Sequence, residues 1–247
     1  MNFLLKFLKL EFPGYYLTFT GMKKIILYIL FLLIPAINNA RIAEFTPGKE
    51  FNEDIYSAVN LANTGLNRDV FALAIKGLTK LNTDGKLQNP DVVTIADYSQ
   101  SCNNKRLYVI DLKNKKLLFN TYVAHGRNTG GEYAKSFSND EGSFKSSLGF
   151  YITENPIVGA HTGFALLIKG VEKGFNDHAL KREIIIHSAE YVSENFIKKY
   201  GRLGRSLGCP VLPPDLNKTI IEAIKGGTCL FIYNPNENYI EKSSLLH

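Results

Sequence analysis

The sequence that decides the fold is Leu107-Tyr-Val-Ile-Asp-Leu112, followed shortly by Lys116-Leu-Leu-Phe-Asn-Thr-Tyr-Val-Ala124. Both runs are rich in β-branched and aromatic residues, and the turn residues Asp111 to Asn114 lie between them. This is the pattern of two consecutive strands. Further runs of the same kind follow at residues 147–153, 164–168, 183–187 and 228–233. The sequence therefore predicts a mainly β domain, either a sandwich or a barrel.

Short helices are predicted around these strands. Apolar residues recur at helical spacing over 53–61 and 69–81, with Asn67 as a plausible N-cap of the second stretch. Two later helices are expected at 193–200, capped by Ser193, and at 214–225, which begins with proline. The expected organisation is a small helical N-terminal part over 41–89, a mainly β domain over 90–235, and a polar tail over 236–247.

Composition excludes several classes of protein. The 247 residues are 45% hydrophobic and 21% charged, which is typical of a globular chain. Of the net charge of +6, a net +3 falls within residues 1–40, so the remaining chain also carries only +3. Nucleic-acid binding usually needs a clustered basic face, and the sequence contains no long basic run. We therefore expect no nucleic-acid partner.

The N-terminal segment 1–40 has the form of a secretory leader. Lys23-Lys24 is followed by an uncharged run from Ile25 to Ile34 and by a short exit that ends at Ala40. Met22 directly precedes the lysines, so it is a candidate for the true start. We expect export to the periplasm or cell envelope. Cleavage near Ala40 and an uncleaved anchor are both open, and the leader is the only expected contact with a membrane.

The densest chemistry lies in Ile184-Ile-Ile-His187-Ser-Ala-Glu-Tyr-Val-Ser193 and in Gly201-Arg-Leu-Gly-Arg-Ser-Leu-Gly-Cys209-Pro-Val-Leu212. A cysteine attacks a carbonyl as its thiolate, and a neighbouring imidazole or cation lowers the thiol pKa. His187 and Cys209 together would supply a base and a nucleophile. A strand-end histidine and a buried apolar cysteine are the alternatives without catalysis.

A second motif overlaps the first. Gly204-Arg-Ser206-Leu-Gly208 matches G-x-S-x-G, the nucleophile turn of α/β-hydrolases. That fold needs an apolar strand before the serine and a histidine later in the chain. The preceding residues 198–205 are largely polar, and the only downstream histidine is His247, the last residue. The serine-hydrolase interpretation is therefore disfavoured.

The stretch from His187 to Pro210 resembles the S-x-G-C signature of the YkuD-type L,D-transpeptidases. It is most similar to the murein L,D-transpeptidase catalytic domain family. Segments at 105–112, 123–127, 137–139, 143–151 and 224–233 resemble the same family in the same order, so the resemblance covers about 90–235. One departure concerns arginine, which in the wider family commonly follows the catalytic cysteine after one residue. Here Pro210 and Val211 follow it.

The resemblance implies a YkuD-like β-sandwich or barrel that acts on peptidoglycan stem peptides. Cys209 would attack the carbonyl of the diamino acid at stem position three, release D-alanine, and pass the acyl group to an amine in a 3–3 cross-link. His187 would take the thiol proton, and the backbone carbonyl of Ser188 would orient its ring. The amides of Gly208 and Cys209 would form the oxyanion site. Further residues implied to line the pocket are Arg205 and Ser206.

Several alternatives remain open at this stage. Water as the acceptor would make the enzyme an L,D-carboxypeptidase. A degenerate domain would bind peptidoglycan without turnover, and Pro210-Val211 is the feature in its favour. Cys209 is expected to be free, whereas Cys102 and Cys229 either form a disulfide or stay unpaired, with Cys229 in the core. No cofactor or metal is implied, and the sequence has no zinc-type cysteine or histidine spacing.

Overall fold

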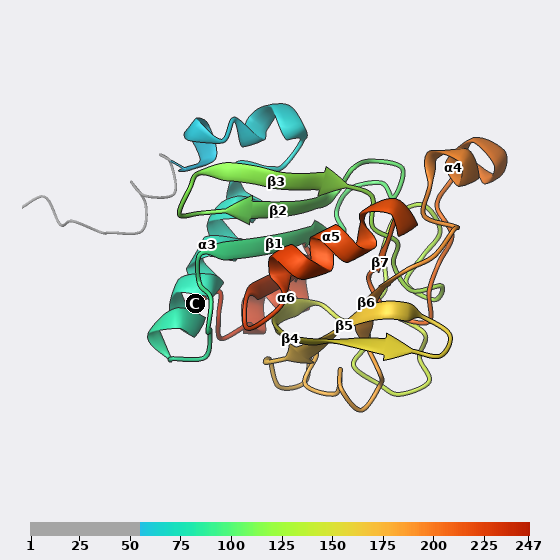
Figure 1. The fold of residues 1–247 in the computed structure, drawn as a ribbon. Coiled ribbons are helices and arrows are strands. Elements are labelled where there is room, and N and C mark those ends of the chain that lie inside the picture. The colour runs from blue at the N-terminus through green and yellow to red at the C-terminus, as the bar shows by residue number, and fades with distance from the viewer. Residues whose placement is uncertain (1–54) are drawn as a thin grey trace, which may run out of the picture. The chain divides into compact units, whose positions relative to one another are not determined.

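The structure is a computed structural model, and it describes residues 55–247 (Figure 1). The leader expected at 1–40, including Met22, lies outside the described residues. Among residues 55–247, no helix has both the length and the apolar character needed to cross a membrane. The elements are η1 (Leu61–Thr64), α3 (Arg68–Thr83), β1 (Val92–Asp97), β2 (Leu107–Asp111), β3 (Lys116–Thr121), β4 (Gly149–Gly159), β5 (Gly163–Gly170), β6 (Ile185–Ser188), α4 (Glu194–Tyr200), β7 (Val211–Leu212), α5 (Pro214–Ile224), β8 (Cys229–Tyr233) and α6 (Glu237–Lys242).

The eight strands form one mixed sheet in the order β3-β2-β1-β8-β4-β5-β6-β7. The pairs β1–β8 and β6–β7 are parallel, and the other neighbours are antiparallel. A register shift between Thr153 and Pro156 interrupts the pairing of β4 with β5, and such bulges bend a strand. The predicted fold class, mainly β with short peripheral helices and a small helical N-terminal part, is confirmed.

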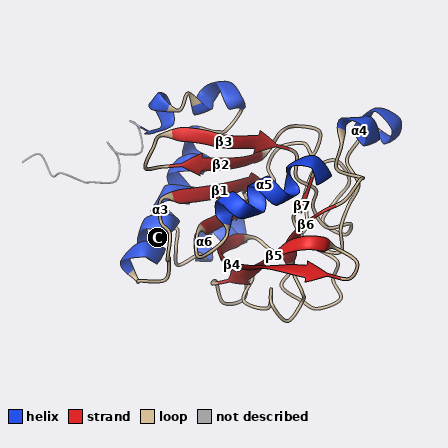
Figure 2. Ribbon diagram, viewed as in Figure 1, coloured by secondary structure: helices blue, strands red, loops and turns tan. Residues whose placement is uncertain are grey.

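Helices cover the central strands on both faces. Figure 2 shows α5 crossing in front of the sheet, where it contacts β5, β6 and β1, and α3 behind β1. The approach of α3 is close, because a Cβ placed on Gly77 would lie 2.1 Å from the ring of Phe150 in β4. Phe150 in turn stacks on Phe231 of β8 at a centroid distance of 4.2 Å. The helical residues before the sheet therefore share one core with it.

The caps of three helices explain where they begin. Asn67 accepts a hydrogen bond from the Asp69 amide at the start of α3, and Ser193 accepts one from Phe196 at the start of α4. Both caps are those predicted from the sequence. Helix α5 begins with proline, which needs no amide partner at that position.

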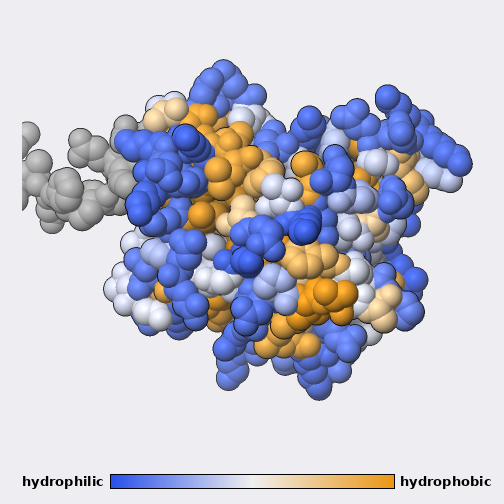
Figure 3. Space-filling view, in the orientation of Figure 1, coloured by the Kyte–Doolittle hydropathy of each residue, from blue (hydrophilic) through white to orange (hydrophobic). Residues whose placement is uncertain are grey.

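The C-terminal segment differs from the prediction. Residues 236–247 were predicted to form a polar tail, but they contain α6 and pack into the core. The physical reason is that three apolar side chains and one hydroxyl are buried there among the polar ones: Tyr239, Leu245, Leu246 and Ser243. The exposed apolar surface lies elsewhere. Figure 3 shows it over β3 and over the β4–β5 hairpin, where Leu118 and Val158 are exposed.

Candidate active site

The parallel pair β6–β7 brings the two predicted catalytic segments together. His187 in β6 is the register partner of Val211 in β7, and Ser188 is the partner of Leu212. Cys209 lies two residues before Val211. Its Sγ contacts the carbonyl oxygen of Glu183 at 3.7 Å, just before β6 begins. His187 thus lies on β6, and Cys209 lies in the loop that leads into the neighbouring strand β7. Among the described residues, no hydrogen bond directly joins the imidazole to the sulfur.

The His187 ring is held in one tautomer. Its Nδ1 lies 3.0 Å from the carbonyl oxygen of Ser188. A carbonyl only accepts, so Nδ1 carries the proton and Nε2 keeps its lone pair. Burial lowers the pKa of His187, which favours the neutral ring at pH 7. The contact expected from the Ser188 backbone is present, and it leaves His187 in the form that a general base requires.

The Cys209 thiol is free and partly exposed. Burial raises its pKa, whereas the Ile185 amide and the charge of Arg182 lower it, and the charge of Glu183 raises it. The thiol donates to the Glu183 carbonyl, and Glu183 has a left-handed backbone with φ 56°. A non-glycine residue in that region is strained, and such strain gathers at functional sites. Because its pKa is raised, the resting cysteine is a protonated thiol that needs a base.

Ser206 lies within residues 201–210, the loop between α4 and β7 that contains Cys209 and is called the cysteine loop below. Its hydroxyl donates to the carbonyl of Cys209 at 2.6 Å and accepts from the Gly208 amide at 3.1 Å. The side chain is only 6% exposed. The predicted role of Ser206 in holding polar groups of a substrate therefore conflicts with its internal bonds. These bonds also leave no free hydroxyl for a serine nucleophile.

Gly208 also differs from the prediction. Its amide was expected in the oxyanion site, but that N–H is donated to Ser206. The requirement for glycine is steric. With φ 135°, an added Cβ would lie 2.9 Å from Ile184 Cδ1 and 3.0 Å from the carbonyl oxygen of Lys145. Gly208 therefore lets the loop pack closely, and of the two predicted amides the one that remains for an oxyanion is that of Cys209.

Arg205 reaches across to a neighbouring loop. Its Nη1 donates to the carbonyl oxygens of Arg127 at 3.1 Å and Gly130 at 3.0 Å. The residue is exposed. The role of Arg205 in binding a substrate stays a prediction.

A fully buried arginine, Arg106, supports the cysteine loop through His125. It was not identified from the sequence. Arg106 donates to the carbonyls of Gln100 and Val123 and to Nδ1 of His125 at 2.8 Å. Burial and this cation lower the pKa of His125 to about 3, so its ring is neutral. The His125 carbonyl accepts the Ser206 amide at 3.0 Å. The signal in the sequence was that Arg106 and His125 each lie within a family-like segment, 105–112 and 123–127.

Arg182 is a second residue that the sequence analysis missed. It lies in the polar segment between β5 and β6 and is half-buried. With Glu183 it lines a cavity of about 300 Å³ that also includes the exposed Leu207 of the cysteine loop. This volume is at the lower end of those that hold small ligands. Nothing in the local sequence, Leu180-Lys-Arg-Glu183, distinguishes this arginine from an ordinary surface charge.

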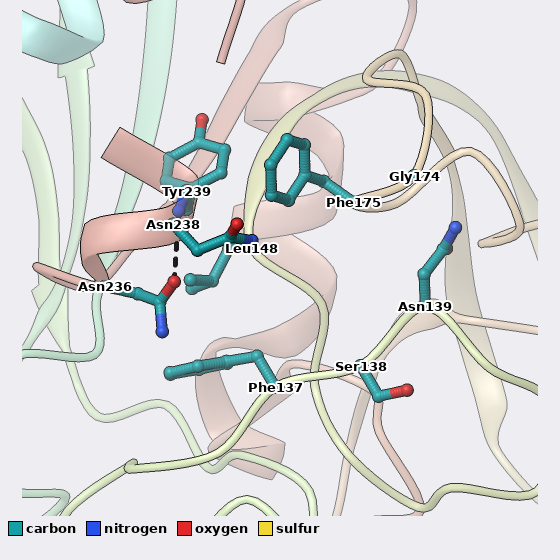
Figure 4. A pocket seen from close by; sticks show the side chains of 9 residues that line it. All are labelled: Phe137, Ser138, Asn139, Leu148, Gly174, Phe175, Asn236, Asn238 and Tyr239. Atoms are coloured by element: carbon teal, nitrogen blue, oxygen red, sulfur yellow. Dashed lines mark hydrogen bonds between the residues drawn. The ribbon is translucent and has the colours of Figure 1, made fainter. Parts of the chain in front are cut away.

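A further cavity of about 220 Å³ is lined in part by residues of segment 137–148 (Figure 4). The rings of Phe137 and Phe175 face it from two different loops, and Asn236 accepts the Tyr239 amide at its wall. None of the six predicted site residues lines it.

The three cysteines are all unpaired. Cys229 is fully buried in β8 within the main core, whereas Cys102 packs in a separate cluster with Val211. Their separation into two clusters explains why the predicted alternative of a disulfide is not realised. The expected free thiol at Cys209 is present.

Comparison with known proteins gives the family. Residues 62–233 match the family described as the L,D-transpeptidase catalytic domain. No match was found among curated proteins. Similar solved structures include an L,D-transpeptidase from Mycobacterium smegmatis (13% identity, 58% of this chain and 59% of that chain, TM-score 0.36). Another is an L,D-transpeptidase from Mycobacterium tuberculosis H37Rv (15%, 58% and 58%, 0.35).

A third is the helical cell shape determining protein Pgp2 from Campylobacter jejuni (14%, 65% and 56%, 0.42). The chain thus spans less than two thirds of the length of each of these solved chains. The family match covers most of the chain, beginning in η1 and ending in β8. The chain belongs to the L,D-transpeptidase catalytic domain family.

Proposed function

We propose that this protein is an exported L,D-transpeptidase that modifies peptidoglycan through a thioester on Cys209. The observation that supports the proposal is the β6–β7 pair, in which His187 is the register partner of Val211, two residues after Cys209. The Ser188 carbonyl fixes the His187 proton on Nδ1, and the cysteine is free. A neutral base and an unpaired thiol are the two groups that nucleophilic catalysis of this kind needs.

In the proposed reaction, Nε2 of His187 takes the thiol proton as Sγ attacks the carbonyl of the diamino acid at stem position three. The C–N bond to D-alanine breaks, and the leaving amine receives the proton from the imidazolium. An acceptor amine then attacks the thioester, restores the thiol and forms a 3–3 cross-link. The Cys209 amide is the candidate donor to the tetrahedral oxyanion.

Pro210-Val211, the departure from the wider family, has a structural explanation. Val211 is buried, pairs with His187, and exchanges two backbone hydrogen bonds with Ala124. The residues after the cysteine therefore build the strand that positions the histidine. This favours an enzyme over a degenerate binding domain. Hydrolysis by water stays an alternative outcome for the same thioester.

Export and location in the periplasm or cell envelope are part of the proposal. They rest on the basic residues Lys23-Lys24 and the uncharged run Ile25 to Ile34 in the sequence. Peptidoglycan lies outside the cytoplasmic membrane, so an enzyme acting on it has to be exported.

The test is covalent labelling followed by product analysis. One of the similar solved structures is an L,D-transpeptidase in complex with imipenem, which makes imipenem a suitable probe. Mass spectrometry should find an adduct on the Cys209 peptide, none in Cys209→Ala, and an unchanged adduct in Cys102→Ala. His187→Ala should slow acylation by roughly 10²–10⁴, the range for losing a positioned base.

Purified muropeptides then separate the two acceptors by product mass. A 3–3 cross-linked dimer supports transpeptidation, whereas a shortened stem without cross-link supports the carboxypeptidase. Folded wild-type protein with a reduced Cys209 that forms neither adduct nor product would contradict the proposed function.

A further inference from the structure

We propose that Arg182 is the positive charge that stabilises the Cys209 thiolate, held in place by its hydrogen bonds to segment 138–147. The inference rests on the proposed cysteine chemistry and adds to it a positioning residue from the connection between β5 and β6.

The guanidinium lies directly against the residue that precedes the nucleophile. A Cβ on Gly208 would be 3.3 Å from Arg182 Nη2 and 3.0 Å from the carbonyl oxygen of Lys145. That same carbonyl accepts a hydrogen bond from Nη2 at 2.6 Å. Arg182 and Lys145 thus form one wall against Gly208. Any side chain at position 208 would meet this wall.

The charge of Arg182 is not neutralised by its hydrogen bonds. Within the described part of the chain they all go to neutral oxygens: the carbonyls of Ser138 and Lys145 and the hydroxyls of Ser143 and Ser147. The residue is half-buried, so its field is screened less than that of a surface charge. The other titratable groups that act on it are Asp140, Tyr151 and Cys209 itself.

The sulfur has few other partners that favour the charged form. Burial raises the pKa of Cys209, the Ile185 amide, the charge of Arg182 and the amide of Cys209 itself lower it, and the charge of Glu183 raises it. Burial, with a smaller contribution from the thiolate charge, raises the pKa of Tyr98 and Tyr191, so these phenols stay neutral. His187 follows on β6 as the base. Among the charged side chains that act on Cys209 in the described part of the chain, Arg182 is therefore the one that favours the anion.

The same hydrogen bonds also fix the geometry of the loop. Segment 138–147 contains Ser146, whose hydroxyl donates to the Gly208 carbonyl at 3.1 Å and accepts the Gly126 amide at 3.0 Å. It also contains Phe144, which lines the cavity next to the site. Losing the guanidinium would therefore loosen this wall as well as remove a charge. The test has to separate the two effects.

Alkylation of Cys209 by iodoacetamide separates them, because only the thiolate displaces iodide. The rate is followed between pH 6 and 11 by mass spectrometry of the Cys209 peptide. Arg182→Gln should raise the pH midpoint by about one unit, since an opposite charge nearby typically lowers a pKa by that amount or more. Below both midpoints, this corresponds to an alkylation rate about tenfold lower.

Arg182→Lys keeps the charge and loses the fork of donors, so its midpoint should stay near that of the wild type. Lys181→Gln removes one positive charge from the adjacent, exposed position and should leave the midpoint unchanged. Arg182→Met is a second neutral variant, and thermal melting shows whether each neutral variant is folded. Arg182→Met serves as the neutral variant if Arg182→Gln does not fold. Its midpoint should move as in Arg182→Gln.

An unshifted midpoint in the folded neutral variants would overturn the proposal. An equal shift in Arg182→Lys and Arg182→Gln would overturn it too, because the charge would then not be the cause. The result is independent of turnover. A wild type that forms no imipenem adduct but shows the predicted shift would contradict the proposed function and leave the role of Arg182 intact.

Discussion

Two fully buried charged groups hold two different parts of this molecule, and neither has a counter-ion among its hydrogen-bond partners. Arg106, at 0% exposure, donates to two backbone carbonyls and to the neutral His125. Glu172, at 4%, accepts from the amide of Phe150 and from the hydroxyls of Tyr239 and Ser243. In both cases neutral dipoles replace the water that the charge has lost.

The two centres differ in what they position. Arg106 orients His125, whose carbonyl holds Ser206 and therefore the cysteine loop. Glu172 ties helix α6 to β4, on the side of the cavity lined by Phe175. The buried cation thus supports the proposed chemistry, and the buried carboxyl supports the C-terminus. Substitutions at the first centre should change both stability and reactivity. Substitutions at the second should change stability alone.

The largest effect is expected from Arg106→Met, which keeps the length of the side chain and removes the donors. The carbonyls of Gln100 and Val123 would be left buried without partners, at about 1–3 kcal/mol each. We expect the free energy of unfolding, measured with urea, to fall by about 3 kcal/mol or more. Acylation by imipenem should also slow, because His125 would lose its orientation.

The matched control is Lys105→Met, the same substitution one residue earlier at an exposed position. It should change the free energy of unfolding by less than about 0.5 kcal/mol. Equal stability of the two variants would show that the buried guanidinium is dispensable and would break the comparison between the two centres.

Sequence patterns predicted strands β2, β3, β4, β5, β6 and β8 and helices α3, α4 and α5. The hairpin β2–β3 was found from its turn, and α4 and α5 from Ser193 and Pro214. Strand β1 was missed. All of its residues are buried, so apolar–polar alternation is lost, but β2 and β8 are almost as buried and were predicted, so burial alone does not explain the omission. Strand β7 has only two residues, and its pairing with β6 defines it. Such a strand has no local signature.

The candidate site, like the fold, was predictable only in part. The motif predicted His187, the Ser188 carbonyl and the free Cys209, because family resemblance carries the order of residues. It did not predict that Ser206 and the Gly208 amide bond to each other, since that depends on the turn between them. The supports Arg106 and Arg182 come from distant segments. Charge type alone does not distinguish a buried arginine from an exposed one.

An intermediate effect is expected from pH, with opposite signs at the two centres. The pKa of His125 is about 3 in the folded protein, below the ordinary 6.5, so the unfolded chain binds the proton first on acidification. Its contribution to stability should therefore be lost as the pH falls from about 6.5 toward 3. Burial raises the pKa of Glu172 above its ordinary 4.5, so its contribution should be lost as the pH rises above that value.

Urea titrations of the wild type, His125→Gln and Glu172→Gln at several pH values between 4 and 8 measure both contributions as differences. Relative to the wild type, His125→Gln should gain stability as the pH falls, and Glu172→Gln should gain it as the pH rises. Parallel pH profiles for all three proteins would mean that neither group titrates differently on folding. Alkylation of Cys209 should be unaffected by Glu172→Gln.

The smallest effect is expected at the exposed contacts of the C-terminal residues that follow α6. Lys80 of α3 donates to the carbonyls of Ser244 at 2.6 Å and His247 at 3.3 Å, where all of the groups meet solvent. If the buried Glu172 centre holds the C-terminus, Lys80→Gln should lower the free energy of unfolding by less than about 0.5 kcal/mol. Hydrogen exchange should quicken only in the last residues, by local fraying. Lys76, which donates to the carbonyl of the buried Leu246 at 2.7 Å, is the graded comparison, because Lys76→Gln should cost about 1 kcal/mol. A loss from Lys80→Gln that equals or exceeds this would mean that exposed lysines, rather than the buried carboxyl, anchor the segment after α6.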